Sequence, residues 1–366
     1  MNCTPENYGI VKTAVGEARL QPIPIPRFRD DYILVKTIAV AINPTDWQTV
    51  DEKPSPRTKG PTLLGCDFAG IVVEIGKGVK KEWKKGDRIA GMAHGVKWIC
   101  LTSADVNTGN DIEPEDGTFA TYIVVKGDVV FHIPDSVSFE EAASLGVGIT
   151  TVALGFYKYL SLPLLTKFPI LIYGGSSATG TLAIQFAKLL RERSGLKVIT
   201  TSSPRNFELL KSLGTDHVLD YHDPNCGAEI RSLTQNKLHH VFDTIATQSS
   251  AQICADALST SGEKIYVNLM GIEMPRDDVK NIFFLGYSVT GEEYEIEGEV
   301  WPAASEDFEL GKTAFVLLER LLQKGLIKNH PVKIMNGGLK GILEGMREMM
   351  EGKVSGEKLV YKVGEP

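Results

Sequence analysis

Residues 169–180 read PILIYGGSSATG, and this stretch decides the fold. A strand-sized apolar run ends at Tyr173 and passes directly into a turn of small residues, and a helical pattern begins at Gly180. Backbone N–H groups at such a turn attract an anion, and small side chains let a pyrophosphate approach the backbone. The spacing is not G-x-G-x-x-G, so a tight turn without a ligand is the alternative interpretation.

The same pattern repeats downstream. Further strands are predicted at 197–201, 217–221, 240–245 and 263–270, and helices at 180–193, 206–213, 226–234 and 250–259. Strands that alternate with helices predict βαβ units and a parallel sheet. Five strands in this order fit a doubly wound Rossmann sheet of the α/β class that binds a dinucleotide.

A different pattern precedes and follows this region. Strands are predicted at 32–41, 68–75, 118–125 and 128–133, with glycine and proline turns between them. A helix at 142–160 opens the nucleotide-binding region, and helices at 308–325 and 339–352 and a strand at 358–363 follow it. We therefore predict a discontinuous β-rich domain, residues 1–138 and 303–366, around a nucleotide-binding domain, residues 139–302. The acidic stretch 292–299 is predicted to be a solvated loop.

Composition excludes several classes of partner. The 366 residues carry 39 Lys and Arg against 46 Asp and Glu, a formal charge of −7, and no basic stripe that would bind nucleic acid or an anionic membrane. The chain shows no apolar signal core and no membrane-length apolar run. The cysteines are scattered without a C-x-x-C pair, which favours a reducing compartment; they are Cys3, Cys66, Cys100, Cys226 and Cys254. A soluble cytoplasmic protein is expected.

The end of the second Rossmann strand indicates which dinucleotide is bound. Residues 200–206 read TTSSPRN and lack the Asp or Glu that would bind a ribose 2′-hydroxyl. Ser203 and Arg205 can both donate to a phosphate, and Arg has the better geometry. NADPH is therefore favoured over NADH, although the same residues would also serve as a helix cap.

Several motifs, taken together, resemble one family. They are NPTDW (43–47), LGCDFAG (64–70), KGDRI (85–89), DGTFA (116–120), YGGSSATG (173–180) and KVSGEK (353–358). The chain resembles the medium-chain dehydrogenase/reductase superfamily on its quinone-oxidoreductase side. More narrowly, it is similar to the fungal trans-acting enoyl reductases of polyketide biosynthesis, the lovastatin enoyl reductase-like and ToxD-like proteins. The resemblance covers residues 10–363 and implies a GroES-like β-rich catalytic domain beside a Rossmann domain.

The resemblance also implies an activity: reduction by NADPH of the α,β double bond of an enoyl thioester, on an intermediate of secondary metabolism that a partner megasynthase carries. The cofactor-binding residues that it implies are Thr45, Asp46, Trp47, Gln48, Ser176, Ser177, Ala178, Thr179, Ser203, Arg205, Asn206, Tyr221, Asn268, Leu269, Val354 and Ser355. The substrate-facing residues are Val147, Gly148, Ile149 and Thr150, and we add Phe283, Phe284, Leu285, Gly286, Tyr287 and Trp301. Thr151 and Gln48 are the catalytic candidates.

A catalytic zinc is not expected. Zinc enzymes of the superfamily use a Cys and a His-Glu pair, and three N or S ligands are needed. Here the first position lies in Asn43-Pro44 and the second reads Cys66-Asp67. Cys66 is interpreted as a small buried hydrophobic residue. A polarised alkene needs no metal, because hydride adds to Cβ and the carbonyl delocalises the charge.

The enolate needs a hydrogen-bond donor and Cα needs a proton. Thr151, or a backbone N–H near it, is the first candidate donor. His94 and His132 are weaker candidates as acids, and Asp46 is interpreted as a structural hydrogen-bonding residue.

Two other functions stay open. Many relatives have Lys where this chain has Gln48, which forms hydrogen bonds but carries no charge. One alternative is therefore a cofactor-binding protein without redox chemistry, such as an isomerase, a cyclase or a synthase partner. The other is a general quinone or enone reductase. Pro275 and the charged residues of the segment 271–281 would blunt a sheet edge, which favours a monomer.

Overall fold

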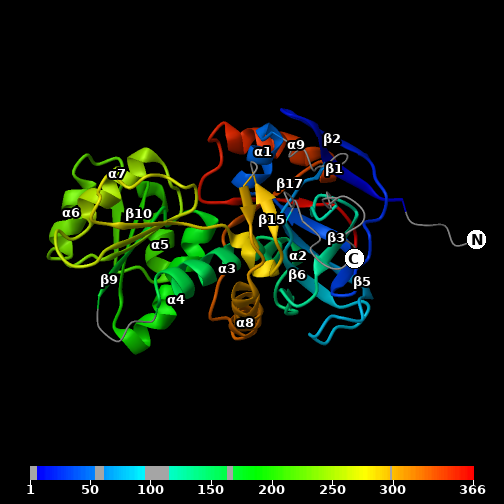
Figure 1. Ribbon diagram of the computed structural model, residues 1–366, viewed down its shortest axis with the longest axis horizontal. Coiled ribbons are helices and arrows are strands. Elements are labelled where there is room, and N and C mark those ends of the chain that lie inside the picture. Colours follow the sequence, from blue (N-terminus) through cyan, green and yellow to red (C-terminus); the bar gives the residue numbers. More distant parts are fainter. Residues whose placement is uncertain (1–5, 54–61, 95–114, 163–167, 297–298) are drawn as a thin grey trace, which may run out of the picture. The chain divides into compact units, whose positions relative to one another are not determined.

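The computed structural model describes residues 6–53, 62–94, 115–162, 168–296 and 299–366. The chain divides into two compact units (Figure 1). Unit 1 comprises Met1–Thr150 and Tyr287–Pro366, and unit 2 comprises Thr151–Gly286.

The divisions fall after residues 150 and 286, and the sequence-based limits were 138 and 302. Residues 139–150 group with unit 1 because, for example, the N–H of Val147 donates to Asp67 Oδ1 at 2.7 Å. Residues 287–302 also group with unit 1, because the Glu292 carboxylate accepts hydrogen bonds from the Tyr32 hydroxyl at 2.8 Å and from Lys126 Nζ at 2.7 Å. Neither contact has a local sequence pattern.

Unit 2 contains a six-stranded parallel sheet in the order β11-β10-β9-β12-β13-β14. Its strands are β9 (Pro169–Tyr173), β10 (Lys197–Ser202), β11 (His217–Asp220), β12 (His240–Asp243), β13 (Ile265–Asn268) and β14 (Lys280–Phe283). This is the dinucleotide-binding order, which reverses between β9 and β12. The predicted series ended at residue 270, and this was wrong: β14 is a sixth strand, short and mostly exposed, so that no apolar run marks it.

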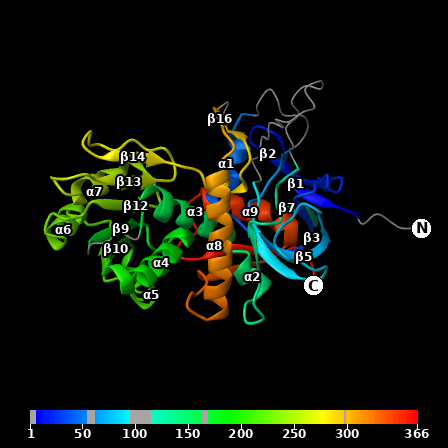
Figure 2. The same ribbon diagram turned by 60° about the horizontal axis from the view of Figure 1, so that its bottom comes forward.

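The helices of unit 2 follow the predicted alternation. They are α4 (Ala178–Ser194), the 3₁₀ turn η2 (Pro204–Asn206), α5 (Phe207–Leu213), α6 (Cys226–Leu233) and α7 (Gln248–Ala257). Helix α4 packs against α5, and α6 packs against α7, as in the two helical layers of a doubly wound fold (Figure 2).

The single helix predicted at 142–160 is wrong. The chain forms α2 (Phe139–Ala142), α3 (Gly146–Ala153) and a π-helical turn, η1 (Leu154–Tyr159), and the division between the two units falls within α3. At Gly146 a Cβ atom would lie 2.2 Å from the carbonyl oxygen of Gly91, so the chain approaches the backbone of β6 (Arg88–Met92) closely just after the break.

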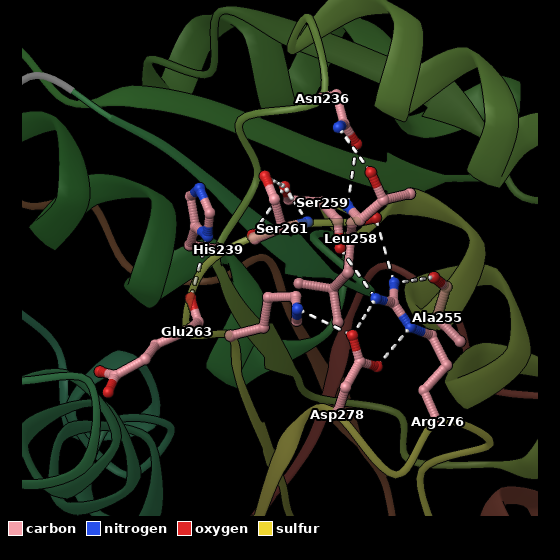
Figure 3. Close-up of polar contacts among 11 residues, drawn as sticks. Asn236, His239, Ala255, Leu258, Ser259, Ser261, Glu263, Arg276 and Asp278 are labelled. Carbon is pink, nitrogen blue, oxygen red and sulfur yellow. Dashed lines mark hydrogen bonds and ion pairs between the residues drawn. The ribbon is translucent and has the colours of Figure 1, made fainter.

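The segment between β13 and β14 is fastened to the C-terminal end of α7 (Figure 3). The Arg276 guanidinium donates to the carbonyl oxygens of Ala255 at 3.0 Å, Leu258 at 3.2 Å and Ser259 at 2.8 Å. It also pairs with Asp278, which accepts from the buried Lys264 at 2.8 Å. Arg276 therefore satisfies helix-terminal carbonyl groups, which otherwise have no intrahelical partner.

Unit 1 is built on a seven-stranded sheet and a smaller three-stranded one. The large sheet has the order β17-β18-β3-β5-β6-β8, with β7 also paired to β3, and the small one has the order β2-β1-β4. Strand β3 (Tyr32–Ala41) has the predicted limits. The others are β1 (Tyr8–Ala14), β2 (Glu17–Pro22), β4 (Thr62–Leu63), β5 (Asp67–Ile75), β6 (Arg88–Met92), β7 (Tyr122–Lys126), β8 (Val130–His132), β17 (Val332–Met335) and β18 (Lys358–Lys362).

Helix α2 and the helices α1 (Pro44–Asp51), α8 (Ser305–Gln323) and α9 (Gly338–Met350) accompany these sheets, as does the 3₁₀ turn η3 (Gly286–Thr290). The core of the unit joins apolar residues of both ends of the chain, since Ile342 and Met346 of α9 pack in one cluster with Phe68 and Val40. The C-terminal segment is therefore part of the β-rich domain, as its return in the sequence predicted.

The described residues of the acidic stretch 292–299, which are 292–296 and Glu299, do not form the predicted solvated loop, so this prediction was wrong for them. Residues Tyr294–Ile296 form β15, which pairs in antiparallel fashion with β16, Glu299–Trp301. Glu295 is buried, and Glu292 bonds to Tyr32 and Lys126. The partners of these carboxylates lie far away in the sequence, so charge alone suggested exposure.

The structure bears on two features that the sequence analysis considered, namely membrane-spanning segments and the state of the cysteines. None of the helices in the described part of the chain is long and apolar enough to cross a membrane. The cysteines among the described residues, Cys66, Cys226 and Cys254, are all buried free thiols. Cys3 and Cys100 lie outside the described residues.

Candidate functional site

The turn between β9 and α4 has the geometry of an anion site within unit 2. Ser177 is the N-cap of α4, and its Oγ accepts a hydrogen bond from the N–H of Gly180 at 2.9 Å. The Ser177 hydroxyl also lies 2.9 Å from that of Thr244, which donates to the carbonyl of Tyr173 at 2.8 Å. These bonds hold the first turn of a 17-residue helix in place, with its N–H groups and positive dipole end facing outward.

The glycines of this turn are required by close packing. Gly174 has a φ of 78°, and a Cβ there would lie 2.4 Å from Ile245. At Gly175 a Cβ would lie 2.1 Å from Thr200 Oγ1, and at Gly180 it would lie 2.3 Å from the carbonyl of Gly174. Ser176, Ser177, Ala178 and Thr179 are half-buried, so this predicted phosphate-binding set is accessible while the glycines beneath it are not.

A second polar corner lies at the ends of β10 and β11. The Ser203 hydroxyl lies 3.2 Å from the Tyr221 hydroxyl, and Tyr221 is 38% exposed. Asn206 Nδ2 donates to Ser202 Oγ at 3.4 Å, and Ser202 Oγ in turn donates to Ser176 Oγ at 3.0 Å. A chain of hydroxyl and amide groups thus connects this corner with the phosphate turn.

Arg205 is exposed on η2 and forms no ion pair with another residue of the described ranges. Asp220, at the end of β11, is bonded to the backbone N–H and to Nδ1 of His222, and these bonds lower the pKa of Asp220. The corner therefore offers a guanidinium and two hydroxyls to an anion. Such a set fits the 2′-phosphate of NADPH.

Asn268, predicted to line the nicotinamide, is buried at the end of β13. Its Nδ2 donates to Asn281 Oδ1 at 2.9 Å, and its Oδ1 accepts from the N–H groups of Met270 and Ile272. Its side chain thus holds the connection to β14. Leu269 is half-buried beside it.

The predicted substrate-facing residues differ in exposure. Gly148, Ile149 and Thr150 are buried, and the Thr150 hydroxyl donates to the carbonyl of Val147 at 2.9 Å. Val147 and Leu285 are half-buried.

Phe284 is buried against Tyr159 of η1, with ring centroids 4.8 Å apart, whereas Phe283 is 39% exposed. Tyr287 stacks on His94 in unit 1 at 3.7 Å. Trp301 stacks on Tyr294 at 5.8 Å. Gly286 and Tyr287 are consecutive residues that belong to different units.

A buried polar cluster in unit 1 joins the start of α1, the start of β5 and the start of β18. Asp67 Oδ2 accepts from Asn43 Nδ2 at 2.9 Å and from Lys358 Nζ at 3.0 Å, and Lys358 Nζ also donates to Asn43 Oδ1 at 2.5 Å. Asp67 Oδ1 accepts from the N–H of Val147. Both oxygens of the Asp67 carboxylate are therefore engaged.

Asp46 lies beside this cluster as the N3 residue of α1. Its Oδ2 accepts from the N–H of Asn43 at 2.6 Å, which confirms a structural capping role. Burial raises the pKa of Asp46 to about 7, and the Asp67 charge acts in the same direction, while the Asn43 hydrogen bond and Lys358 lower it. The group therefore holds a proton up to neutral pH.

Cys66 lies between two candidate residues, one predicted to bind the cofactor and the other predicted to face the substrate. Its Sγ is 4.0 Å from the hydroxyl of Thr45, a predicted cofactor residue, and 3.6 Å from that of Tyr287, a predicted substrate residue. Burial raises the pKa of Tyr287 well above its ordinary value. Sequence reasoning missed this link, because a single cysteine in an apolar motif carries no signal of its partners.

The remaining candidates occupy ordinary positions. Gln48 and Trp47 are half-buried on α1, Val354 packs on the unit 1 core, and Ser355 is exposed. Thr151 is buried at the start of unit 2. His132 lies 3.4 Å from Asp87 and 3.6 Å from Glu319 and stacks on Trp83, which is a structural environment.

Comparison with known proteins identifies the class and then the family. Residues 29–135 match the family of the alcohol dehydrogenase GroES-like domain, and residues 178–309 match that of zinc-binding dehydrogenases. The solved structure of CurK enoyl reductase covers 98% of this chain and 99% of its own with a TM-score of 0.72 at 18% identity, which shows the same fold. The two domains define a medium-chain dehydrogenase/reductase with a GroES-like and a Rossmann domain.

Curated relatives narrow the class. Trans-enoyl reductase ACTTS2 of Alternaria alternata is 43% identical over 97% of this chain and 98% of its own length. Trans-enoyl reductase TOXD of Cochliobolus carbonum is 50% identical over 75% of this chain and 86% of its own. The chain belongs to the trans-enoyl reductase family.

The residues present do not fit the zinc that one matched family's description implies. At the two ligand positions, Asn43 and Asp67 are bonded to Lys358, and Cys66 is the one thiol among them. Across the described ranges, no group of three or more His, Cys, Asp or Glu side chains could hold a metal ion. In this cluster the cation that Asp67 binds is the buried Lys358 ammonium.

Proposed function

We propose that this chain is a zinc-independent, NADPH-dependent enoyl reductase that reduces the α,β double bond of an enoyl thioester. The thioester is a polyketide-type intermediate of secondary metabolism, carried by a separate synthase. Membership of the trans-enoyl reductase family supports the reaction. The observation that carries the choice of cofactor is the corner of Ser203, Arg205 and Tyr221, which offers donors to a 2′-phosphate.

When bound, NADPH would supply a hydride to Cβ of the substrate. Ser176, Ser177, Ala178 and Thr179 would bind the pyrophosphate through the turn and the helix N-terminus. Ser203, Arg205 and Asn206 would bind the 2′-phosphate, with Tyr221 beside the adenosine. Thr45, Asp46, Trp47, Gln48, Asn268, Leu269, Val354 and Ser355 remain the proposed residues of the nicotinamide side.

Once Cβ has accepted the hydride, negative charge develops on the thioester oxygen, and a fixed donor stabilises it. Thr151 remains the proposed donor to this oxygen. We also propose that the protein works as a cytoplasmic monomer, a setting that the buried free thiols fit.

The direct test is NADPH oxidation, followed by absorbance, with purified protein and 2-enoyl thioesters of increasing chain length. Parallel reactions contain NADH or no substrate, and mass spectrometry identifies the product. Turnover with NADPH and a saturated product supports the proposal and shows that Gln48 is compatible with reduction. NADPH binding without oxidation across enoyl thioesters, enones and quinones would contradict it.

A further inference from the structure

We propose that Tyr287 is the acid that protonates Cα after hydride transfer, and that Asp46 returns the proton to Tyr287 through the Cys66 thiol. This inference rests on the proposed function and names the proton source that the reaction needs. All three residues belong to unit 1.

The first observation is the geometry of the three side chains. The Tyr287 hydroxyl lies 3.6 Å from Cys66 Sγ, and Cys66 is fully buried. The thiol also lies 4.0 Å from the hydroxyl of Thr45, the residue next to Asp46 in α1, and Cys66 is one of the groups that lower the pKa of Asp46. One thiol, which both donates and accepts weakly, thus stands between a phenol and a carboxyl group.

The second observation is that only one of the two carboxyl oxygens of Asp46 is used in capping α1. Oδ2 caps α1, whereas Oδ1 is buried and accepts no hydrogen bond of normal geometry from the described part of the chain. A helix cap needs one oxygen only, so the cost of burying the second is not explained by the cap. A proton on this oxygen would satisfy it.

The third observation is that Tyr287 is held in one orientation. Its ring stacks on His94 with centroids 3.7 Å apart, and Tyr294 meets both rings edge-on. The phenol is 6% exposed, so its hydroxyl is shielded from bulk water. An acid that is fixed in this way protonates one face of a planar enolate.

The proposed step is balanced as follows. Hydride addition, for which NADPH would break a C–H bond and become NADP⁺, forms the C–H bond at Cβ, and the π electron pair moves onto the thioester enolate. The enolate then forms the Cα–H bond as the Tyr287 O–H bond breaks. The phenolate takes the Cys66 proton, and the Asp46 carboxyl gives its proton to the sulfur. Solvent later reprotonates Asp46.

The direction of transfer follows from the acid strengths. A buried phenolate is unfavourable, since burial raises the pKa of Tyr287 well above its ordinary value, so a nearby proton source has to neutralise it. Asp46 is mostly protonated below neutral pH. The titratable and charged groups around Asp46 are Lys358 of β18, Asp67 of β5, Cys66 in the loop before β5 and Tyr287 of η3, with His94 behind the phenol.

The decisive experiment uses an α-methyl 2-enoyl thioester with NADPH in D₂O, because the product records which face of Cα was protonated. The wild-type protein is expected to give one configuration at Cα. Y287F is expected to react roughly 100-fold more slowly, the usual effect of losing a general acid, and to give both configurations. Y294F removes a hydroxyl from the same aromatic cluster and serves as the matched control, with rate and configuration kept.

Two results overturn the inference. The first is a Y287F protein that still gives a single configuration, whatever its rate, because a structural defect slows the reaction without changing which face is protonated. The second is a Y294F protein that loses the single configuration as Y287F does. A wild-type protein that consumes no NADPH with any enoyl thioester overturns the proposed function itself, which separates the two failures.

The pH profile tests Asp46 as the proton source. The wild-type kcat is expected to fall above about pH 7, where Asp46 ionises. D46N keeps the capping oxygen but cannot titrate, so its kcat is expected to be lower and flat from pH 6 to pH 8.5, within roughly a factor of two. A D46N profile that falls as the wild type does would remove Asp46 from the pathway.

Discussion

Lys358 Nζ lies 3.0 Å from Asp67 Oδ2, although 291 residues separate the two in the sequence. Lys358 is 6% exposed and Asp67 is fully buried. The pair connects the first residue of β18 with the first residue of β5 and engages Asn43 as well. A buried charge that loses its partner is strongly destabilising, so this pair makes the stability of unit 1 depend on one ammonium group.

Replacing that ammonium is the first prediction. Lys358→Met is expected to lower the free energy of unfolding by about 3–5 kcal/mol, because Asp67 stays buried without its counter-charge. Urea denaturation followed by tryptophan fluorescence measures the change. Lys362→Met in the same strand is the control, since Lys362 forms an exposed pair with Glu365 and should change stability by less than about 1 kcal/mol. Equal losses in the two variants would contradict the prediction.

The second prediction concerns pH and Asp46. Its pKa is about 7 in the folded protein and about 3.9 when unfolded, so the folded state binds more protons between these values. The contribution of Asp46 to stability is therefore largest at low pH and is lost as the pH rises toward 7.

Asp46→Asn removes this dependence. The gain in Tm over the wild type is expected to be larger at pH 8 than at pH 5, with a difference in free energy on the order of a few kcal/mol. Thermal unfolding at both pH values checks it, and Asp51→Asn at the exposed end of the same helix is the control. A gain that is the same at both pH values would show that Asp46 is ionised throughout.

Cofactor choice gives the third prediction. Arg205→Ala is expected to weaken NADPH binding by about 10-fold or more, the value of a charge-assisted hydrogen bond, and to leave NADH binding unchanged. Fluorescence titration of reduced cofactors measures both affinities. Lys211→Ala is the control. It removes a cation from α5, the helix that begins directly after η2, and should change neither the NADPH affinity nor the NADH affinity. Equal weakening of NADPH and NADH would place Arg205 outside the 2′-phosphate corner.

The fourth prediction concerns the phosphate turn. A Cβ at Gly175 would lie 2.1 Å from Thr200 Oγ1, so Gly175→Ala is expected to destabilise unit 2 by about 1–3 kcal/mol and to impair cofactor binding. Adding Thr200→Ala removes the atom that clashes. The double variant should therefore lose less stability than the sum of the two single variants. Strict additivity in a double-mutant cycle would show that the two side chains do not meet.

The fifth prediction concerns the contacts in Figure 3. Arg276→Ala leaves carbonyl groups at the end of α7 without donors and frees Asp278. A loss of about 1–2 kcal/mol is expected. Arg347→Ala on α9 is the control, because its pair with Glu344 is exposed and three residues apart. Hydrogen exchange should rise in residues 269–279 of the Arg276 variant alone.

Local patterns predicted much of the fold. Strand β3 was predicted with its observed limits because its residues alternate and are β-branched, and the β9–α4 turn because small residues follow a buried strand. Strand β14 was missed, since Lys280 and Asn281 give it no apolar run. The helix at 142–160 was predicted as one element because apolar residues continue through the break.

The candidate site was less predictable, for a physical reason. A phosphate turn is a contiguous sequence, so its residues can be found in one motif. The contacts of Cys66 and Lys358 arise only when distant strands meet, and neither residue type indicates its partner. The same holds for Glu292, whose charge suggested a solvated loop although Tyr32 and Lys126 bind it.

The sheet of unit 1 incorporates β18 next to β3, which has a consequence for synthesis on the ribosome. Asp67 emerges 291 residues before its ammonium partner. At ordinary translation rates this interval lasts roughly 15–60 s, long enough for unit 2 to fold first. Throughout that time the nascent β-rich domain holds an uncompensated acid and an open edge, which makes it the part of the newborn chain that a chaperone has most reason to protect.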